Sequence, residues 1–325
     1  MEIGIIGLGG ISGLHMDVLN SIKNINVKCV FDIDKKAIEL FQNQYPACKK
    51  SSSLDEFVQE SLDIVAVLTP PKTHFELINS LIDKGVKNIF CEKPLVLNIN
   101  ELKKLYARYQ KDNSKIFIGQ SYLFFPHILE MKKYICEKNE NLRNFNIEYK
   151  KPIEKIKPLD GWRSKYEGYV IQDNGVHLID LLRFVTDDDV KVLNAIGGNT
   201  SNRIRGFDFA SLNLKLNKGG LGNILFNHNS QNEETLYSGE HNYFFETYSL
   251  HLTRDNLKAI DYEGNETVVL PKVKEDWFTS FTNMWLTFLE NIKHERTSRI
   301  NIENNYNTVS SVCKSVDYAK KYWME

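Results

Sequence analysis

Gly7-Leu8-Gly9-Gly10-Ile11-Ser12-Gly13 follows an apolar run at residues 2–7 and precedes residues that fit one face of a helix. The order of strand, glycine loop and helix is typical of a dinucleotide-binding unit. The first glycine allows a tight turn, and the second lets the backbone approach a pyrophosphate. Ser12 replaces the third glycine of this pattern and is small enough for close packing of the helix on the strand. We expect five residues to contact the cofactor: Gly7, Gly9, Gly10, Ile11 and Ser12.

A glycine loop alone is a weak signal, and an acidic residue downstream strengthens it. The second predicted strand, residues 27–31, ends at Asp32, and Asp34 follows. An acidic residue about 20 positions beyond the loop can accept hydrogen bonds from ribose hydroxyls. Such a carboxylate repels a ribose phosphate, so the sequence favours NAD over NADP, although Lys35 and Lys36 leave NADP open. Asp32 or Asp34 is also a candidate N-cap for a helix at 35–44, and both roles can coexist.

The first 120 residues alternate between strands and helices. Further strands are predicted at 64–68, 88–91 and 115–119, and helices at 11–23, 35–44, 54–60, 73–84 and 99–110. Alternation of this kind, in which these ranges give five of the six strands that a dinucleotide fold needs, indicates an α/β fold in which a parallel, doubly wound sheet forms a Rossmann domain. We assign residues 1–120 to this dinucleotide-binding domain.

Lys93 lies at the carboxyl end of the predicted strand 88–91, within Glu92-Lys93-Pro94. Open α/β sheets bind their ligands at that end of their strands. Pro94 fixes one backbone dihedral, so the turn that carries Lys93 is stiff, and a cis Lys93–Pro94 bond is one form that the turn can take. Taken alone, Lys93 is also consistent with an ordinary surface lysine in a loop.

The alternation stops after Gln120, and a second domain, residues 121–325, is predicted to begin there. Helices are predicted at 126–137, 277–294 and 302–323, and strands at 142–149, 190–196, 207–216, 221–229, 243–253 and near 257–269. Most of these strands alternate apolar and polar residues. The pattern predicts a C-terminal α+β domain with an open, largely antiparallel sheet that carries helices on one face.

Asp173 and His177 straddle the predicted start of a helix just after Gly175. One interpretation makes Asp173 an N-cap and His177 an ordinary residue of the first turn. The other makes them a functional pair. A helix N-terminus keeps a histidine neutral and available as a base, and a carboxylate four residues away can orient the imidazole.

The composition excludes several other classes of protein. The 325 residues are 42% hydrophobic and 26% charged, as in a globular protein of about two domains. The net charge of -1 gives no electrostatic reason to expect nucleic acid or an anionic membrane as a partner. No apolar run approaches the roughly 18 residues of a membrane span, and Glu2 after Met1 argues against a secretory signal. The five scattered cysteines predict neither disulfides nor a metal site, so we expect a cytoplasmic protein.

The motifs occur in the order found in the Gfo/Idh/MocA oxidoreductases, which the chain resembles over essentially its whole length. The motifs that carry the resemblance are Gly7–Ser12, Thr69-Pro70-Pro71 with His74, Cys91-Glu92-Lys93-Pro94, Gly161-Trp162-Arg163 and Asp173-x-Gly175-x-His177. This resemblance implies an NAD-dependent dehydrogenase that acts by hydride transfer on a secondary alcohol of a sugar, nucleotide sugar or cyclitol. We prefer a nucleotide sugar among these substrates. The resemblance also implies a homodimer or homotetramer that forms through the sheet of the second domain.

The resemblance further implies roles for individual residues. Lys93, Asp173 and His177 would be catalytic, and which of Lys93 and His177 transfers the proton stays open. The cofactor would also be contacted by Asp32, Thr69, Pro70, His74, Glu92 and Lys93. The substrate would be contacted by Tyr122, Trp162, Arg163, Asp173 and His177. Alternatively, Trp162 packs against the sheet and Arg163 pairs with an acid.

Two departures from the family pattern alter the predicted walls of the substrate pocket. Tyr169 follows Gly168 where the family often has paired glycines, and Phe124 and Phe125 stand where an arginine often precedes the proline. A substrate therefore cannot be transferred by analogy. Two other functions stay open: a redox-neutral lyase or glycosidase that uses bound NAD, and a non-catalytic protein that senses NAD(P). Retention of Lys93, Asp173 and His177 together argues against the second.

Overall fold

The computed structural model describes residues 1–112, 114–152, 162–201, 204–228, 239–274, 276–294 and 299–323. The chain forms two compact units. The first comprises Met1–Phe124 and Trp277–Val309, and the second comprises Phe125–Asp276 and Ser310–Glu325. The division predicted at residue 120 therefore differs from these units for residues 121–124 and 277–309, which belong to the first unit. Of the quoted motifs, Gly161 lies outside the described residues, as does the end of the predicted strand 221–229.

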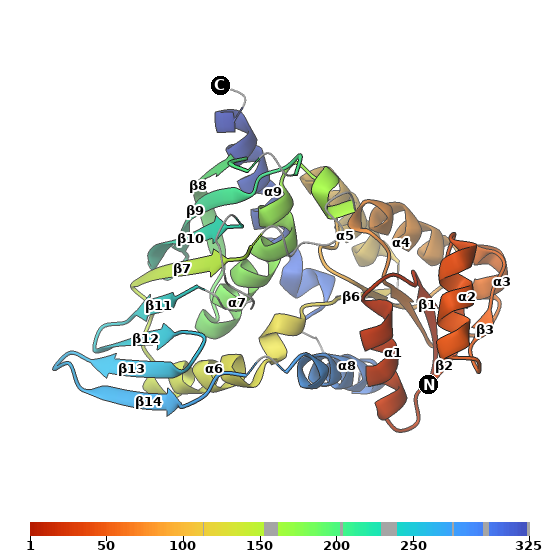
Figure 1. Ribbon diagram of the computed structural model, residues 1–325, viewed down its shortest axis with the longest axis horizontal. Helices are drawn as coiled ribbons and strands as arrows, with labels where there is room; N and C mark the ends of the chain where they lie inside the picture. The colour runs from red at the N-terminus through yellow and green to blue at the C-terminus, as the bar shows by residue number, and fades with distance from the viewer. Residues whose placement is uncertain are drawn as a thin grey trace. The chain divides into compact units, whose positions relative to one another are not determined.

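The first unit contains a parallel sheet of six strands in the order β3-β2-β1-β4-β5-β6, which confirms the predicted Rossmann fold (Figure 1). Its strands are β1 (Glu2–Ile6), β2 (Asn26–Phe31), β3 (Lys49–Lys50), β4 (Ile64–Val67), β5 (Asn88–Cys91) and β6 (Lys115–Ile118). Its helices are α1 (Ser12–Ser21), α2 (Lys35–Gln44), α3 (Leu54–Val58), α4 (His74–Asp83), α5 (Ile99–Lys111) and α8 (Trp277–His294). The two-residue strand β3 is the one strand of this sheet that the sequence ranges above do not include.

The apolar strands of this sheet are buried, as expected for strands that helices cover on both faces. All four residues of β4 are buried, and Phe90 and Cys91 of β5 are fully buried. Gly85 follows α4 with a φ of +83°, the left-handed conformation in which helices commonly end. At the edge of the sheet, Ile118 N donates to Ile300 O at 2.7 Å, so the segment after α8 extends the sheet beside β6.

The second unit contains a sheet of eight strands in the order β14-β13-β12-β11-β7-β10-β9-β8. All neighbouring strands are antiparallel except β7 and β10, which are parallel, so the predicted largely antiparallel sheet is confirmed. The strands are β7 (Asn144–Lys150), β8 (Val190–Gly198), β9 (Phe209–Leu216), β10 (Leu221–Asn227), β11 (His241–Phe244), β12 (Tyr248–Leu252), β13 (Leu257–Asp261) and β14 (Glu266–Leu270).

Helices cover one face of this sheet, as Figure 1 shows. They are α6 (Pro126–Lys138), α7 (Val176–Thr186) and the second-unit part of α9 (Ile302–Trp323). Residues along each strand alternate between buried and more exposed positions, for example in β9 and β12, because only one face packs on the helices. Among the described residues of this unit, no helix covers the opposite face of the sheet.

Two of the predicted strands are hairpins. The predicted strand 243–253 lies across β11 and β12, which a turn separates. In that turn, the Glu140 carboxylate accepts hydrogen bonds from the amides of Glu246 (2.9 Å) and Thr247 (3.1 Å). The predicted strand near 257–269 is split into β13 and β14 at Gly264, whose φ is +87°. Local periodicity continues through both turns, so it does not reveal them.

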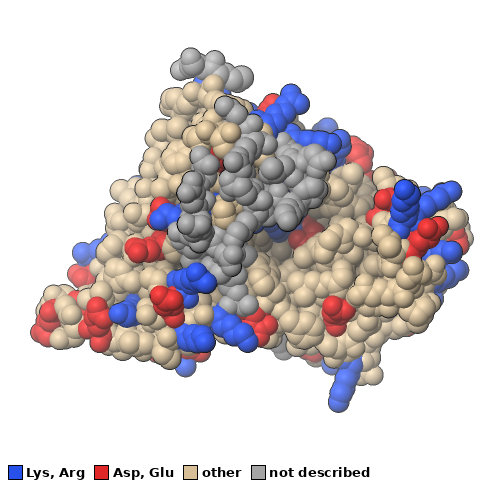
Figure 2. Space-filling view, in the orientation of Figure 1, with Lys and Arg blue, Asp and Glu red and all other residues tan. Residues whose placement is uncertain are grey.

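The described residues include no helix that is long and apolar enough to cross a membrane. On the face that Figure 2 shows, Lys and Arg side chains are interspersed with Asp and Glu. Within the same described ranges, no three His, Cys, Asp or Glu side chains are grouped as metal ligands would be.

Candidate functional site

The glycine loop leaves open space at the N-terminus of α1. Gly7 has a φ of +96°, and a Cβ there would lie 2.8 Å from the backbone of Leu68, so only glycine fits. Gly9 and Gly10 are exposed, and a Cβ on either would meet no atom within 4 Å. Ser12 Oγ donates to Gly9 O at 2.6 Å, so the residue in place of the third glycine closes the loop. The loop therefore fits a dinucleotide, whose pyrophosphate such a helix start binds.

Asp32 and Asp34 divide the two roles that the sequence left open. Asp34 caps α2 by accepting a hydrogen bond from Lys36 N at 2.9 Å. Asp32 accepts hydrogen bonds from Leu8 N in the glycine loop at 2.7 Å and from Asp34 N at 2.9 Å. A carboxylate has about four lone-pair sites, so Asp32 can still accept bonds from a ribose diol. The geometry fits the predicted role of Asp32 toward NAD.

His74 lies beneath the turn at Thr69 and Pro70, and its predicted contact with the cofactor stays a prediction. Its ring is fully buried, with Nε2 2.8 Å from Thr69 O and Nδ1 3.0 Å from Pro94 O. Burial lowers the pKa of His74, and the two carbonyl groups oppose that shift. The ring ties the turn after β4 to the turn after β5, so it acts on the site through the backbone.

The turn Glu92-Lys93-Pro94 follows β5, and its Lys93–Pro94 bond is cis. Lys93 is half-buried, whereas the Glu92 side chain is largely enclosed. Glu92 Oε2 accepts a hydrogen bond from Lys93 N at 3.1 Å, and Glu92 Oε1 lies 3.0 Å from His15 Nε2. The glutamate therefore holds the backbone of the predicted catalytic lysine.

His15 and Trp285 also belong to this site, and the sequence analysis did not identify them. Trp285 Nε1 donates to His15 Nδ1 at 2.9 Å. His15 lies on the buried face of α1, where its polarity among apolar neighbours is a signal that sequence reasoning could have used. Trp285 is 270 residues away in the chain, so no local pattern connects the two.

Tyr122, predicted to contact the substrate, is 4% exposed and belongs to the first unit. Its ring packs edge-on against Trp277 at a centroid distance of 5.6 Å. Within this unit, the Tyr122 side chain therefore packs in an aromatic contact and is not exposed as the wall of a substrate pocket would be.

Asp173 and His177 lie inside one helical segment of the second unit, so the prediction that they straddle a helix start is wrong. Tyr169 and Val170 are already helical, and a π-helical turn from Ile171 to Gly175 leads into α7. No side chain caps this turn, and the helix-terminus argument for a neutral His177 no longer applies. Both side chains are buried, at 7% and 3% exposure. Single π-helical turns are frequent at functional sites.

Arg163 and Trp162 lie beside Asp173. Arg163 Nε is 3.4 Å from Asp173 Oδ2, and the guanidinium stacks 4.2 Å from the centre of the Trp162 ring. The alternative in which Arg163 pairs with an acid is therefore confirmed. The Arg163 side chain keeps 39% of its surface exposed, so it can still contact a ligand.

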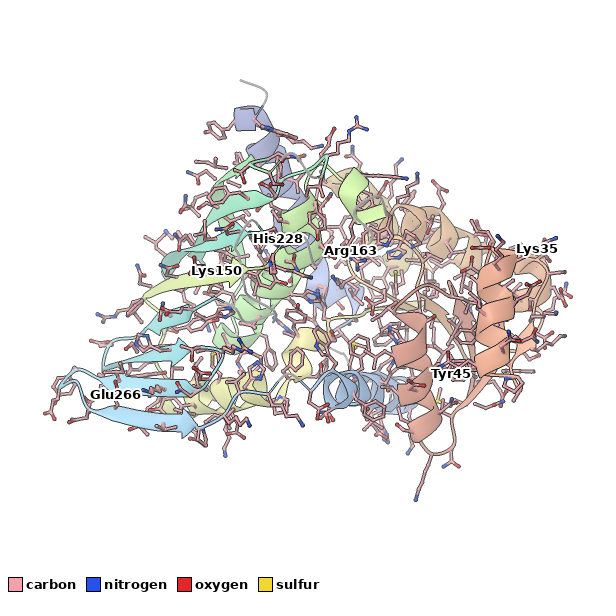
Figure 3. All side chains as sticks on the ribbon, viewed as in Figure 1. Lys35, Tyr45, Lys150, Arg163, His228 and Glu266 are labelled. Atoms are coloured by element: carbon pink, nitrogen blue, oxygen red, sulfur yellow. The ribbon has the colours of Figure 1, made fainter. Side chains whose placement is uncertain are left out.

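Three further polar residues gather near Asp173 without completing their hydrogen bonds. Tyr169 Oη, Asn174 Oδ1 and both ring nitrogens of His228 are buried and have no partner within the described part of the chain. The Tyr169 and His228 rings meet edge to face at 5.4 Å, and Figure 3 shows where His228 and Arg163 lie in this unit. Burial lowers the pKa of His228 to about 3 and raises the pKa of Tyr169, so both are neutral at pH 7.

Comparison with known proteins identifies both halves of the chain. Residues 1–120 match the family model of the oxidoreductase family with an NAD-binding Rossmann fold, and residues 141–251 match the GFO/IDH/MocA C-terminal domain. Glucose-6-phosphate 3-dehydrogenase of Bacillus subtilis is 27% identical over 194 residues, which cover 58% of this chain and 54% of that protein. Myo-inositol 2-dehydrogenase of Thermotoga maritima is 26% identical over 233 residues, which cover 69% and 67%.

A solved structure shows the same fold over the whole chain. An oxidoreductase from Agrobacterium radiobacter, in complex with NAD+, L-tartaric acid and magnesium, aligns with a TM-score of 0.88 at 16% identity. The alignment covers 99% of this chain and 97% of that one. The match to the Bacillus subtilis relative, by contrast, spans about half of that relative's length.

Proposed function

The chain belongs to the Gfo/Idh/MocA family of oxidoreductases, and we propose that it is an NAD-dependent dehydrogenase that oxidises a secondary alcohol of a sugar or cyclitol. The observation that carries the proposal is the joint presence of a fitting dinucleotide loop, a lysine at the carboxyl end of β5 and the buried Asp173–His177 pair. A protein that only bound NAD would need the first of these and not the other two.

The first unit supplies the cofactor site. The open glycine loop at α1 would bind the pyrophosphate, and Asp32 would accept hydrogen bonds from the ribose hydroxyls. The acidic side chain there favours NAD over NADP. When bound, NAD accepts the hydride from the carbon that carries the substrate hydroxyl. The two turns that His74 connects would border the nicotinamide end, because they follow β4 and β5 at their carboxyl ends.

The catalytic roles are assigned to Lys93, Asp173 and His177. Lys93 would donate a hydrogen bond to the reacting oxygen and stabilise its developing negative charge. His177 would accept the hydroxyl proton as a general base. Asp173 would hold a substrate hydroxyl or orient the base, and its carboxylate lies 3.4 Å from Arg163 Nε. Oxidation then gives a ketone, one proton and one hydride.

The substrate class follows from the groups near Asp173. Tyr169, Asn174 and His228 are neutral and offer both donors and acceptors, which suits the vicinal hydroxyls of a sugar or cyclitol ring. The two relatives reported above are named for glucose-6-phosphate and myo-inositol. Arg163 adds a cation that a phosphate or carboxylate could contact. A phosphorylated or nucleotide-linked sugar therefore stays within the proposal beside a neutral cyclitol.

The direct test is nicotinamide reduction by the purified protein with NAD or NADP across nucleotide sugars, sugar phosphates, free sugars and inositols. The proposal expects NADH formation with at least one member, and higher kcat/KM with NAD than with NADP. Product without net NADH would instead indicate redox-neutral chemistry. Tight NAD binding with no product from any member would indicate a sensing role.

We also propose that a second copy of the chain covers the open face of the second-unit sheet. Ile196 and Leu221 are 51% and 46% exposed there, and neighbouring positions of β9 and β10 are only half-buried. Apolar side chains on an uncovered sheet mark an interaction surface. Light scattering on a sizing column should give a dimer or tetramer, and Ile196→Asp should lower the mass. A monomeric wild-type protein would contradict this proposal.

A further inference from the structure

His15 lies at the centre of a buried chain of hydrogen bonds in the first unit. It belongs to α1, its ring is fully buried, and α1 packs beside α8 (Figure 1). Trp285 Nε1 on α8 lies 2.9 Å from His15 Nδ1, and His15 Nε2 lies 3.0 Å from Glu92 Oε1. The chain of contacts thus connects α8 with the turn that carries Lys93.

The donors and acceptors in this chain can be assigned in one direction only. The indole nitrogen of Trp285 is a donor and cannot accept, so His15 Nδ1 must carry the lone pair. The neutral ring then carries its proton on Nε2 and donates it to Glu92 Oε1. The second oxygen of Glu92 accepts from Lys93 N at 3.1 Å. Trp285 therefore donates to His15, and both His15 and Lys93 N donate to the carboxylate of Glu92.

The surrounding packing prevents this chain from rearranging. Edge-to-face contacts hold the His15 ring at centroid distances of 5.4 Å from Phe90, 5.0 Å from Phe281 and 5.8 Å from Trp285. On the other side, a Cβ on Gly119 would lie 2.7 Å from Glu92 Oε1, so the backbone passes directly against the carboxylate. Aromatic rings thus surround the imidazole, and backbone lies against one oxygen of the carboxylate. The orientation of Glu92 is therefore set by its neighbours before any ligand binds.

We propose that His15 and Trp285 are positioning residues of the catalytic turn. They orient Glu92, which in turn fixes the backbone of Lys93 through its second carboxylate oxygen. This inference rests on the proposed function, because it assigns Lys93 to the reacting oxygen. It gives α8 a role in catalysis, although no residue of α8 is assigned to the cofactor or the substrate.

Kinetics of the full-length protein test the role. His15→Leu removes the donor to Glu92, and we expect kcat to fall about 10- to 100-fold, since a displacement near 1 Å can cost that much. The Kd for NAD, measured by calorimetry, should change less than about twofold, because the glycine loop and Asp32 are untouched. His15→Gln offers one donor and one acceptor and should recover most of the lost kcat. Trp285→Phe keeps an aromatic ring and should give an intermediate loss.

Phe288→Leu is the matched control, because Phe288 is buried on the same helix, contacts Trp285 and makes no side-chain hydrogen bond. It should lower Tm and leave kcat unchanged. Unchanged kcat in His15→Leu, or equal losses in His15→Leu and His15→Gln, would overturn the proposal. If His15→Leu does not fold, the kcat values of His15→Gln, Trp285→Phe and Phe288→Leu are compared instead. Equal kcat in all three variants would overturn the proposal.

A second measurement does not depend on turnover. Nitrogen-15 NMR of histidine-labelled protein, assigned with His15→Gln, should show His15 near pH 7 as the neutral tautomer with its proton on Nε2. A proton on Nδ1 would overturn the proposed direction. If no substrate reduces NAD but this tautomer is observed, the proposed function fails while the buried chain of hydrogen bonds stands.

Discussion

The polar groups around Lys93 in the first unit have partners before any ligand binds. Both ring nitrogens of His15 and both carboxylate oxygens of Glu92 lie within 3.1 Å of a hydrogen-bonding partner. The side chains lie on the elements that position the cofactor in a Rossmann fold. Groups that are preorganised in this way need no rearrangement at the moment of reaction.

The polar groups around Asp173 in the second unit differ. Tyr169 Oη, Asn174 Oδ1 and both nitrogens of His228 are buried without partners among the residues described. A buried polar atom without a partner costs about 1–3 kcal/mol, so such a group suits a site that a ligand or ordered water completes. The comparison indicates that the carboxylate of Glu92 and the ring of His15 beside Lys93 are paired in advance, whereas Tyr169, Asn174 and His228 near Asp173 leave hydrogen bonds that a ligand or ordered water could complete.

The largest effect is expected at Lys93. Lys93→Met keeps the length of the side chain and removes its charge, so kcat should fall by roughly 10²–10⁴-fold, the range for a positioned catalytic group. Because the glycine loop and Asp32 are unchanged, the Kd for NAD should stay within about twofold. Stopped-flow turnover and calorimetry would measure the two quantities. Near-normal turnover would exclude Lys93 from the mechanism. The ordered groups around it, Glu92 and His15, would then have no catalytic role.

The second unit should lose stability in mild acid. Burial lowers the pKa of His127 to about 4 and of His228 and His241 to about 3. The unfolded chain binds these protons below its histidine pKa of about 6.5, whereas the folded protein does not. Stability is therefore complete above that pH and is lost as the pH falls. The expected loss at pH 5 is on the order of 1–2 kcal/mol per histidine.

Urea unfolding between pH 7.5 and pH 5 would measure this loss. His228→Phe removes one buried histidine. The free energy of unfolding should then change less steeply with pH, by the uptake of about one proton, whereas substitution of the exposed His294 by Gln should change this slope little. Equal pH dependence in wild type and His228→Phe would show that the second unit does not keep this ring neutral, and the comparison between the units would weaken.

A pair of tyrosines tests the comparison within the second unit. Tyr149 and Tyr169 are both 1% exposed and both contact the His228 ring, but only the Tyr149 hydroxyl has a described partner, Asn174 Nδ2 at 3.1 Å. Tyr149→Phe should destabilise the ligand-free protein by about 1–2 kcal/mol, because it leaves an amide unpaired. Tyr169→Phe should be neutral or stabilising. Urea unfolding of the two variants would measure the difference. Equal losses of stability for both would mean that the Tyr169 hydroxyl has a hydrogen-bond partner.

Much of the fold could be predicted because the hydrophobic pattern of its longer elements is local. The helices at 35–44, 277–294 and 302–323 have the bounds that their periodicity predicted. The strand β3 consists of two exposed lysines, so it has no hydrophobic pattern from which a strand could be predicted. The place of α8 in the first unit depends on contacts with α1 that are remote in the chain.

Site residues could be proposed where one short motif contains the chemistry, as at Asp32 and Lys93, whose roles stay predictions. The site was not predictable at the helix that carries Asp173. Glycine in a helix interior costs about 1 kcal/mol, so local propensity puts the helix start after Gly175. In the structure the residues of the π-helical turn are all buried, and their packing overrides that preference.

The smallest effect is expected at Arg163, and it distinguishes an anionic substrate from a neutral one. The contact with Asp173 is 3.4 Å long and its arginine is 39% exposed, so Arg163→Met should change stability by less than about 1 kcal/mol. If the substrate is anionic, KM should rise up to about fivefold for a sugar phosphate and stay unchanged for inositol, and Arg163→Lys should preserve most of the affinity. Steady-state kinetics on the two substrates would measure the split. Equal changes for both would mean that Arg163 acts only on Asp173, and that the neutral side chains of Tyr169, Asn174 and His228 alone distinguish ligands.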